Sequence, residues 1–112
     1  METKIELNIK ATSPCIKFCK ASLRDQVEKI KEEVLEVEEA LEAFYTDGSV
    51  EEREEKVIPL LMEMYDVIAC VNTMHKQLEV QYPSYFSEAK RILAEASVLN
   101  KNMARGYYAA EE

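Results

Sequence analysis

Hydrophobic residues recur at intervals of three and four along most of the chain, which is the spacing of an amphipathic α-helix. The first stripe consists of Ile16, Cys19, Leu23, Val27, Ile30, Val34, Val37, Leu41 and Phe44. It predicts either one long helix, or a short helix and then a long one with a break near Ala21. The segment Thr46-Asp47-Gly48 is expected to end it, because Gly and Asp tolerate the left-handed conformation of a helix terminus.

The N-terminal end of this stripe is marked by Ser13-Pro14, which predicts a serine cap followed by proline in the first helical turn. Residues 1–12 are expected to form a tail. Apolar and polar residues alternate in it as in a β-strand, but no partner strand is visible in the sequence; the apolar positions are Ile5, Leu7 and Ile9.

A second helix is predicted to begin at Ser49-Val50-Glu51-Glu52, which has the form of a capping box, and to reach about Val80. Pro59 lies inside its pattern, so this helix either kinks there or is divided into two. Tyr82-Pro83-Ser84 predicts the next turn. The last helix has one apolar face, made of Phe86, Ala89, Leu93, Ala96, Leu99 and Met103.

Gly106 is expected to end the last helix and to leave residues 107–112 as a tail. The predicted fold is all-α: an antiparallel bundle of three long helices plus a possible short N-terminal helix, completed by oligomerisation. With 112 residues, the chain is expected to form one domain spanning 1–112.

The net charge of the chain limits the classes of partner that it can bind. A net charge of −8 argues against a nucleic-acid backbone and against an anionic membrane surface, which both require clustered Lys and Arg. A triphosphate can still bind if a cation lies between it and the protein.

The three cysteines, an odd number, predict reduced core thiols rather than disulfides, and the charged N-terminus has no secretory pattern. Both features favour a cytoplasmic protein.

The candidate chemistry begins in the segment 57–74, whose apolar residues surround the helix and predict burial on most sides. The two charged residues in it, Glu63 and Asp66, are three apart and project from one face. Carboxylates in apolar surroundings are costly unless they are protonated, paired or bound to a cation. A salt bridge to Lys or Arg is the competing explanation.

The preceding helix supplies two further carboxylates. At 100° per residue, Glu33 lies about 60° and Glu36 about 120° from the centre of the apolar stripe, so both lean toward the interior. Two facing pairs of carboxylates predict a site for Mg²⁺, or alternatively Mn²⁺ or Ca²⁺, because these cations prefer oxygen ligands. The alternative for this acidic helix is a solvated surface.

These residues resemble a known family. Glu32-Glu33-x-x-Glu36, 26 intervening residues and then Glu63-x-x-Asp66 are similar to the EExxE…ExxD signature of the all-alpha nucleoside triphosphate pyrophosphohydrolases. That superfamily includes MazG, the dCTP pyrophosphatases and the dimeric dUTPases, and the resemblance covers roughly residues 22–108. The absence of tryptophan is a departure from MazG that bears on the nucleobase preference.

The resemblance implies Mg²⁺-dependent cleavage of a nucleoside triphosphate to the monophosphate and pyrophosphate by a homodimer or homotetramer. It implies that Glu33, Glu36, Glu63 and Asp66 hold the metal, and that Glu32 takes a second metal or orients the attacking water. The implied substrate-binding residues are Asn72, Lys101, Asn102, Arg105 and Tyr107.

Each substrate-binding assignment has a structural alternative. Asn72 could instead bond to the backbone or lie on the helix surface, and the basic C-terminal residues could serve the helix dipole. Two other functions also remain open for the whole chain: a catalytically silent oligomerisation or adaptor module, and a simple divalent-metal-binding protein.

Overall fold

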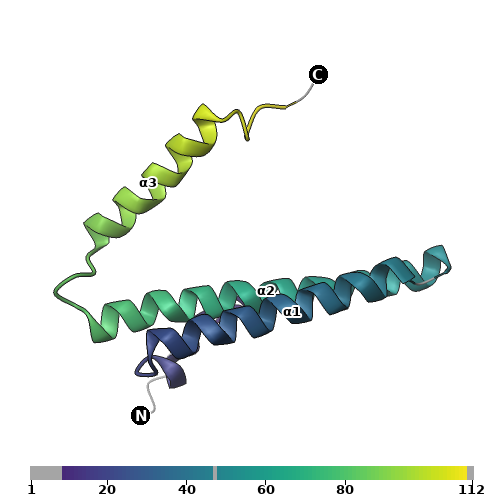
Figure 1. Ribbon diagram of the computed structural model, residues 1–112, viewed down its shortest axis with the longest axis horizontal. Coiled ribbons are helices and arrows are strands. Elements are labelled where there is room, and N and C mark those ends of the chain that lie inside the picture. The colour runs from purple at the N-terminus through teal and green to yellow at the C-terminus, as the bar shows by residue number, and fades with distance from the viewer. Residues whose placement is uncertain (1–8, 47, 111–112) are drawn as a thin grey trace, which may run out of the picture. The chain divides into compact units, whose positions relative to one another are not determined.

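The protein is all-helical. The computed structural model describes residues 9–46 and 48–110, and within these ranges it contains helices and no strand. The elements are a 3-10 helix η1 (Ile16–Phe18) and the α-helices α1 (Leu23–Thr46), α2 (Val50–Gln81) and α3 (Glu88–Ala104) (Figure 1). The predicted all-α class with three long helices is therefore confirmed. The strand-like positions Ile5 and Leu7 lie outside the described residues.

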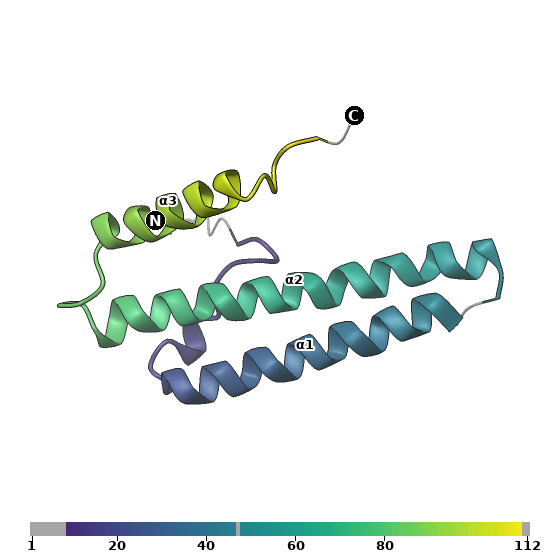
Figure 2. The same cartoon turned by 45° about the horizontal axis from the view of Figure 1, so that its top comes forward.

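The chain divides into two compact units, Met1–Gln81 and Tyr82–Glu112. In the first, α1 and α2 lie side by side as an antiparallel hairpin (Figures 1 and 2). The Ser49 Oγ accepts a hydrogen bond of 3.0 Å from the Glu52 backbone N–H, which confirms the predicted cap of α2. The helix then continues without a break through Pro59.

The start of the first long helix differs from the prediction. A short helix and a break are present, but Ser13 does not cap η1: Cys15 precedes it, without a side-chain cap. The Ser13 Oγ accepts a 2.8 Å bond from the Lys10 N–H instead. The cap of α1 is Ser22, whose Oγ accepts a 3.0 Å bond from the Asp25 N–H, as serine does at an N-cap.

Residues 12–21, named here the N-terminal strap, run against α2 (Figure 2). The strap is held by side chains of α2 that bind its backbone. The bonds are Asn72 Nδ2 to Thr12 O at 2.7 Å, Cys15 N to Thr73 Oγ1 at 2.9 Å, Gln77 Nε2 to Phe18 O at 3.0 Å, and Gln81 Nε2 to Cys19 O at 2.9 Å and Ala21 O at 2.5 Å. On the strap's side, all of these hydrogen bonds involve backbone groups.

The interior of the hairpin is polar. Among the described residues, Ala69 is the single buried hydrophobic residue. The buried polar residues Gln26, Thr73 and Gln77 are named here the amide cluster, after its two glutamine side chains. Gln77 is 0% exposed, and its Nε2 also donates to Gln26 Oε1 at 3.2 Å. The Gln26 Nε2 donates in turn to the Cys70 carbonyl at 2.9 Å. Most polar atoms of the cluster thus find hydrogen-bond partners within the chain, as buried amides require.

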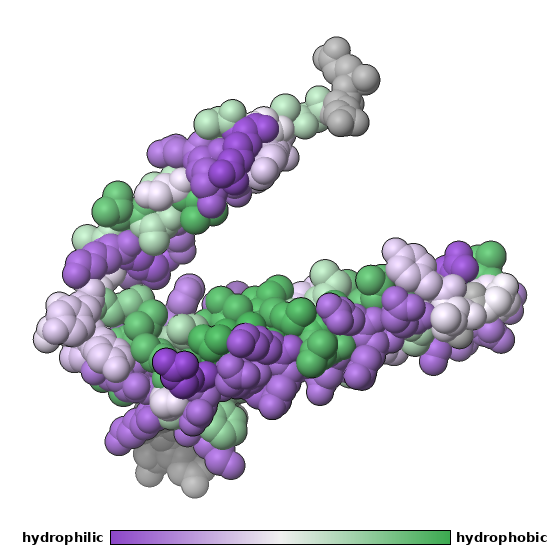
Figure 3. All heavy atoms as spheres, viewed as in Figure 1, coloured by the Kyte–Doolittle hydropathy of each residue, from purple (hydrophilic) through white to green (hydrophobic). Residues whose placement is uncertain are grey.

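The predicted burial of segment 57–74 is wrong for this single chain. Ile58 and Met62 are 64% and 60% exposed, because only α1 and the strap are available within this unit to cover α2. Figure 3 shows hydrophobic side chains gathered along the visible side of the hairpin. The core-cysteine prediction is also wrong: Cys15 is exposed, and Cys19 and Cys70 are half-buried, although all three thiols are free as expected.

The long apolar helix α2 meets the length and composition of a membrane-spanning helix, with a window of mean hydropathy 1.4. Core helices of soluble proteins meet the same criteria. Carboxylates are costly inside a bilayer, and α2 carries Glu63 and Asp66 near its middle.

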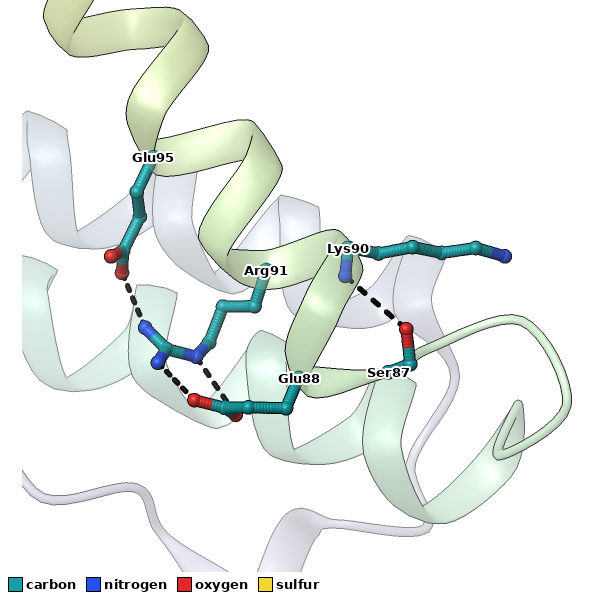
Figure 4. A network of polar contacts seen from close by, with 5 residues as sticks. All are labelled: Ser87, Glu88, Lys90, Arg91 and Glu95. Atoms are coloured by element: carbon teal, nitrogen blue, oxygen red, sulfur yellow. Dashed lines mark hydrogen bonds and ion pairs between the residues drawn. The ribbon is translucent and has the colours of Figure 1, made fainter.

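In the second unit, α3 is capped by Ser87, whose Oγ accepts a 3.2 Å bond from the Lys90 N–H. One turn on, Arg91 binds Glu88 and Glu95 through its guanidinium (Figure 4). The helix ends as predicted at Gly106, which has a φ of 73°. Its N–H donates to Met103 O, and the next N–H donates to Asn102 O, which is the pattern of a Schellman motif.

Candidate metal centre

Three of the predicted carboxylates come together between α1 and α2. Oxygens of Glu33, Glu36 and Glu63 all lie within 4.8 Å of one another, and these residues are named here the acid cluster. Glu33 and Glu36 are three residues apart on α1, so both face the neighbouring helix, and Glu63 approaches from α2. The hairpin therefore places carboxylates from two helices at one point, as the sequence predicted.

Two oxygens of this cluster are buried without a partner. Glu33 is 7% exposed, and its Oε2 makes no hydrogen bond; the Oε2 of Glu63 is likewise buried and unpaired. A buried carboxylate oxygen without a donor is strongly unfavourable. Acidic groups often gather on surfaces without binding anything, but these two orphaned oxygens fit a bound cation. The donor set, made only of carboxylate oxygens, suits a hard divalent ion such as Mg²⁺ or Mn²⁺.

The other oxygen of Glu33 is partly compensated. Its Oε1 lies 2.9 Å from the Lys29 Nζ, and this hydrogen bond lowers the pKa of Glu33 against the opposing effect of burial. Lys29 is about half exposed, with 51% of its side chain accessible. The competing salt-bridge explanation thus holds in part for Glu33, whereas no ion pair between described residues involves Glu63 or Asp66.

The electrostatics of the acid cluster are unfavourable without a counter-charge. Hydrogen bonding with Glu33 and the negative charge of its carboxylate, followed by the same effects from Glu63, raise the pKa of Glu36 to about 7. Adjacent carboxylates cannot all ionise at low cost, so Glu36 holds its proton to a higher pH than an isolated carboxyl does. A divalent cation would replace that proton and remove the repulsion.

The remaining predicted acids are not part of this group. Asp66 is exposed and is not among the three clustered carboxylates, although it follows Glu63 by less than one turn of α2. Glu32 is also exposed, with 68% of its side chain accessible, and its closest cationic contact is Lys29 Nζ at 3.9 Å. Their assigned roles, fourth metal ligand and water-orienting base, stay predictions.

Asn72 is placed by the strap. Its Nδ2 donates to the Thr12 carbonyl at 2.7 Å, which matches the backbone-bonded alternative for this residue. The neighbouring side chains Thr73, Gln77 and Gln81 perform the same task, and sequence reasoning missed them. Their spacing of four residues on one helix face is the signal that could have identified them.

The predicted phosphate-binding residues all lie in the second unit, at the C-terminal end of α3. Asn102 Nδ2 donates to the Tyr108 hydroxyl at 3.2 Å, and the Arg105 guanidinium lies 5.9 Å from the centre of the Tyr107 ring. Lys101 is exposed in the last turn of α3, where the helix dipole stabilises a positive charge.

A cavity of about 240 Å³ lies in the first unit, next to the acid cluster along the hairpin. Its walls come from the strap, α1 and α2, and include Cys15, Phe18, Cys70 and Lys29. Lys29 connects the two features, because it lines the cavity and also binds Glu33.

No protein-family model, curated protein or solved structure matches this chain, so its assignment depends on the residues themselves.

Proposed function

We propose that this protein is a nucleoside triphosphate pyrophosphohydrolase that requires a divalent cation, Mg²⁺ or Mn²⁺, at the acid cluster. The observation that carries the proposal is the pair of buried, unpartnered oxygens, Glu33 Oε2 and Glu63 Oε2. They belong to the spaced carboxylates of the EExxE…ExxD pattern. Carboxylates of this pattern on a solvated surface would gain little from a cation, whereas a cation would stabilise these two buried oxygens.

The chain's own residues would divide the work. Glu33, Glu36 and Glu63 hold the cation, with Asp66 as a fourth ligand, and Glu32 accepts a proton from the attacking water. When bound, the cation neutralises phosphate charge and lowers the pKa of a water molecule. Lys101, Asn102, Arg105 and Tyr107, in the second unit, are cationic and hydrogen-bonding groups suited to triphosphate oxygens, and the family resemblance assigns them to the phosphates. This division predicts separable effects on metal binding and on turnover.

The cavity supports the proposal. Its walls are mostly apolar and include Phe18 from the strap. Lys29 lines the cavity and also binds Glu33 of the acid cluster, so the two features are neighbours. Aromatic and apolar side chains accept the face of a nucleobase. A volume of about 240 Å³ is below the usual range for drug-sized ligands, and so suits one small planar group.

The test is a panel of ribo- and deoxyribonucleoside triphosphates incubated with Mg²⁺ or Mn²⁺, with pyrophosphate as the readout. We expect pyrophosphate from at least one nucleotide and at least a 100-fold lower rate, roughly, for Glu63→Gln, which removes a metal ligand. Glu39→Gln is the matched control, because it neutralises an exposed carboxylate on α1, the helix that also carries Glu33 and Glu36.

Arg105→Gln separates the two halves of the proposal. It should slow pyrophosphate release while metal affinity stays as in the wild type, because Arg105 is assigned to phosphate and not to metal. A folded, metal-binding protein that releases pyrophosphate from none of the nucleotides would contradict the enzyme assignment.

The second candidate is a divalent-metal-binding protein without catalysis. It is favoured by the fact that the acid cluster is assembled entirely within Met1–Gln81, whereas all four C-terminal candidates belong to the other unit. Metal binding that depends on Glu63, without turnover of any nucleotide, would select this candidate.

A further inference from the structure

Two of the three cysteines share a cavity wall. Cys15, which immediately precedes η1, and Cys70, near the middle of α2, both line the cavity of about 240 Å³, although 54 residues lie between them in the sequence. Cys19 is not among the lining residues. The fold therefore brings one particular pair of thiols together and provides Cys19 as an internal comparison.

The backbone of Cys15 is fixed close to Cys70. Its N–H donates a 2.9 Å bond to the Thr73 Oγ1, and Thr73 is 1% exposed. The Thr73 hydroxyl donates to the Ala69 carbonyl at 2.8 Å, which locks its rotamer. Because Cys70 and Thr73 are three residues apart on α2, they share a helix face, and Cys15 is attached to that same face.

The two thiols differ in accessibility. Cys15 is exposed and Cys70 is half-buried. Burial, followed by the charge of Glu33, raises the pKa of the Cys70 thiol, and a negative charge on Cys15 would raise it further. A reagent in solution therefore meets Cys15 first, and Cys70 is positioned as the second, resolving thiol.

We propose that Cys15 and Cys70 form a reversible intramolecular disulfide that ties the N-terminal strap to α2 beside the acid cluster. The oxidant is a low-molecular-weight disulfide such as glutathione disulfide. The Cys15 thiolate attacks it, releasing one glutathione thiolate and leaving a mixed disulfide; Cys70 then attacks the Cys15 sulfur and releases the second. Two S–H bonds are lost and one S–S bond forms, and two electrons and two protons pass to the glutathione.

The consequence is control over the strap. Without the disulfide, the hydrogen bonds that hold residues 12–21 to α2 are neutral side-chain-to-backbone bonds, and no covalent bond joins the two. A covalent bond from Cys15 to Cys70 would prevent detachment and occupy part of the cavity wall. If the cavity accepts the nucleobase, which rests on the proposed function, oxidation would lower the affinity for nucleotide while leaving the acid cluster intact.

Peptide mapping tests the disulfide independently of any activity. The full-length protein is incubated with excess glutathione disulfide, its free thiols are alkylated, and it is digested with trypsin without reduction. Trypsin places Cys15 in peptide 11–17, Cys19 in 18–20 and Cys70 in 57–76, because Lys17 separates the first two. We expect peptide 11–17 linked to 57–76, its loss after reduction, and an oxidised protein whose melting temperature is about 5 °C or more higher.

Variants give the control. Cys19→Ser should form the same linked peptides, whereas Cys15→Ser and Cys70→Ser should form none and should melt alike with and without oxidant. Three results would overturn the proposal: links that involve Cys19, links between two copies of the chain, or unlinked Cys15 and Cys70 under oxidant excess. Since these readouts measure the bond itself, they stand even if no nucleotide is hydrolysed.

Discussion

The α1–α2 hairpin buries polar side chains in two places, and the two differ in whether their partners are present within the chain. In the amide cluster, Gln77 binds the strap and Gln26, and Gln26 binds the Cys70 carbonyl. In the acid cluster, two buried carboxylate oxygens have no hydrogen bond to a donor group, and the chain itself can offer them only the protonated carboxyl of Glu36. The amide cluster leaves one neutral oxygen unpaired, Gln77 Oε1, which costs much less than a charged one.

This difference separates a structural feature from a binding feature. Neutral amides that bind backbone groups hold the strap in place and need nothing from solution. Carboxylates that face one another are stable only with a proton or a cation between them. The same hairpin thus has one buried polar group that builds the fold and another that, under the proposed function, would bind a cation.

The largest effect is expected on metal affinity. Glu63→Gln and Glu33→Gln each remove a ligand oxygen's charge, and either should weaken Mn²⁺ binding at least about 100-fold in a calorimetric titration. Gln77→Ala should leave that affinity unchanged, because the amide cluster binds no metal. An equal loss in the Glu39→Gln control would mean that the effect is only one of net charge.

The next largest effect is on stability. Gln77→Ala removes the donor to Phe18 O and Gln26 Oε1 and leaves buried acceptors unpaired, so the free energy of unfolding should fall by about 2–3 kcal/mol in urea titrations. The control Glu79→Ala, which removes an exposed 3.5 Å ion pair on the same helix, should change it by less than about 1 kcal/mol. A similar change in the free energy of unfolding for both variants would contradict a structural role of the amide cluster.

A smaller effect is expected from pH, and only from the acid cluster. In the metal-free protein, the pKa of Glu36 is raised from its ordinary 4.5 to about 7. Between these values the native state binds more protons than the unfolded state, so the free energy of unfolding should decrease as pH rises. Glu33 has the opposite shift, and its contribution is lost only as pH falls below its ordinary range.

Urea titrations with a chelator, from pH 4.5 to 8, measure this slope. Glu36→Gln should flatten it and Gln77→Ala should not, because Gln77 does not titrate. An unchanged slope in Glu36→Gln would show that other groups cause the pH dependence.

Local signals were sufficient for most of the fold. Ser49 and Gly106 marked helix ends correctly, because caps depend on a few neighbouring residues. Ser13 misled, since a serine before proline resembles a cap, while Ser22, which follows the 3-10 helix η1, is the actual cap of α1. The strap was not foreseen because it is held by long-range bonds between side chains of α2 and a backbone about 60 residues away.

The candidate site was predictable to the extent that charge and periodicity determine it. Glu33 and Glu63 stood out because they lie at interior-facing positions of otherwise apolar stripes, and the hairpin brings them together with Glu36. The burial of segment 57–74 was overestimated, because periodicity reports which faces are apolar and not what covers them. Oligomerisation, which could cover them, stays a prediction.

The central claim is that the acid cluster lacks a cation and not a protein partner. Thermal unfolding of the wild type and Glu63→Gln at pH 8, each with a chelator and with Mg²⁺, tests it most directly. With chelator, Glu63→Gln should melt at or above the wild type, because it removes the charge of a carboxylate whose Oε2 is buried without a partner. With Mg²⁺ the melting temperature of the wild type should rise and that of the variant should not change. A variant that melts below the wild type without metal, together with a wild type that does not respond to Mg²⁺, would contradict the account.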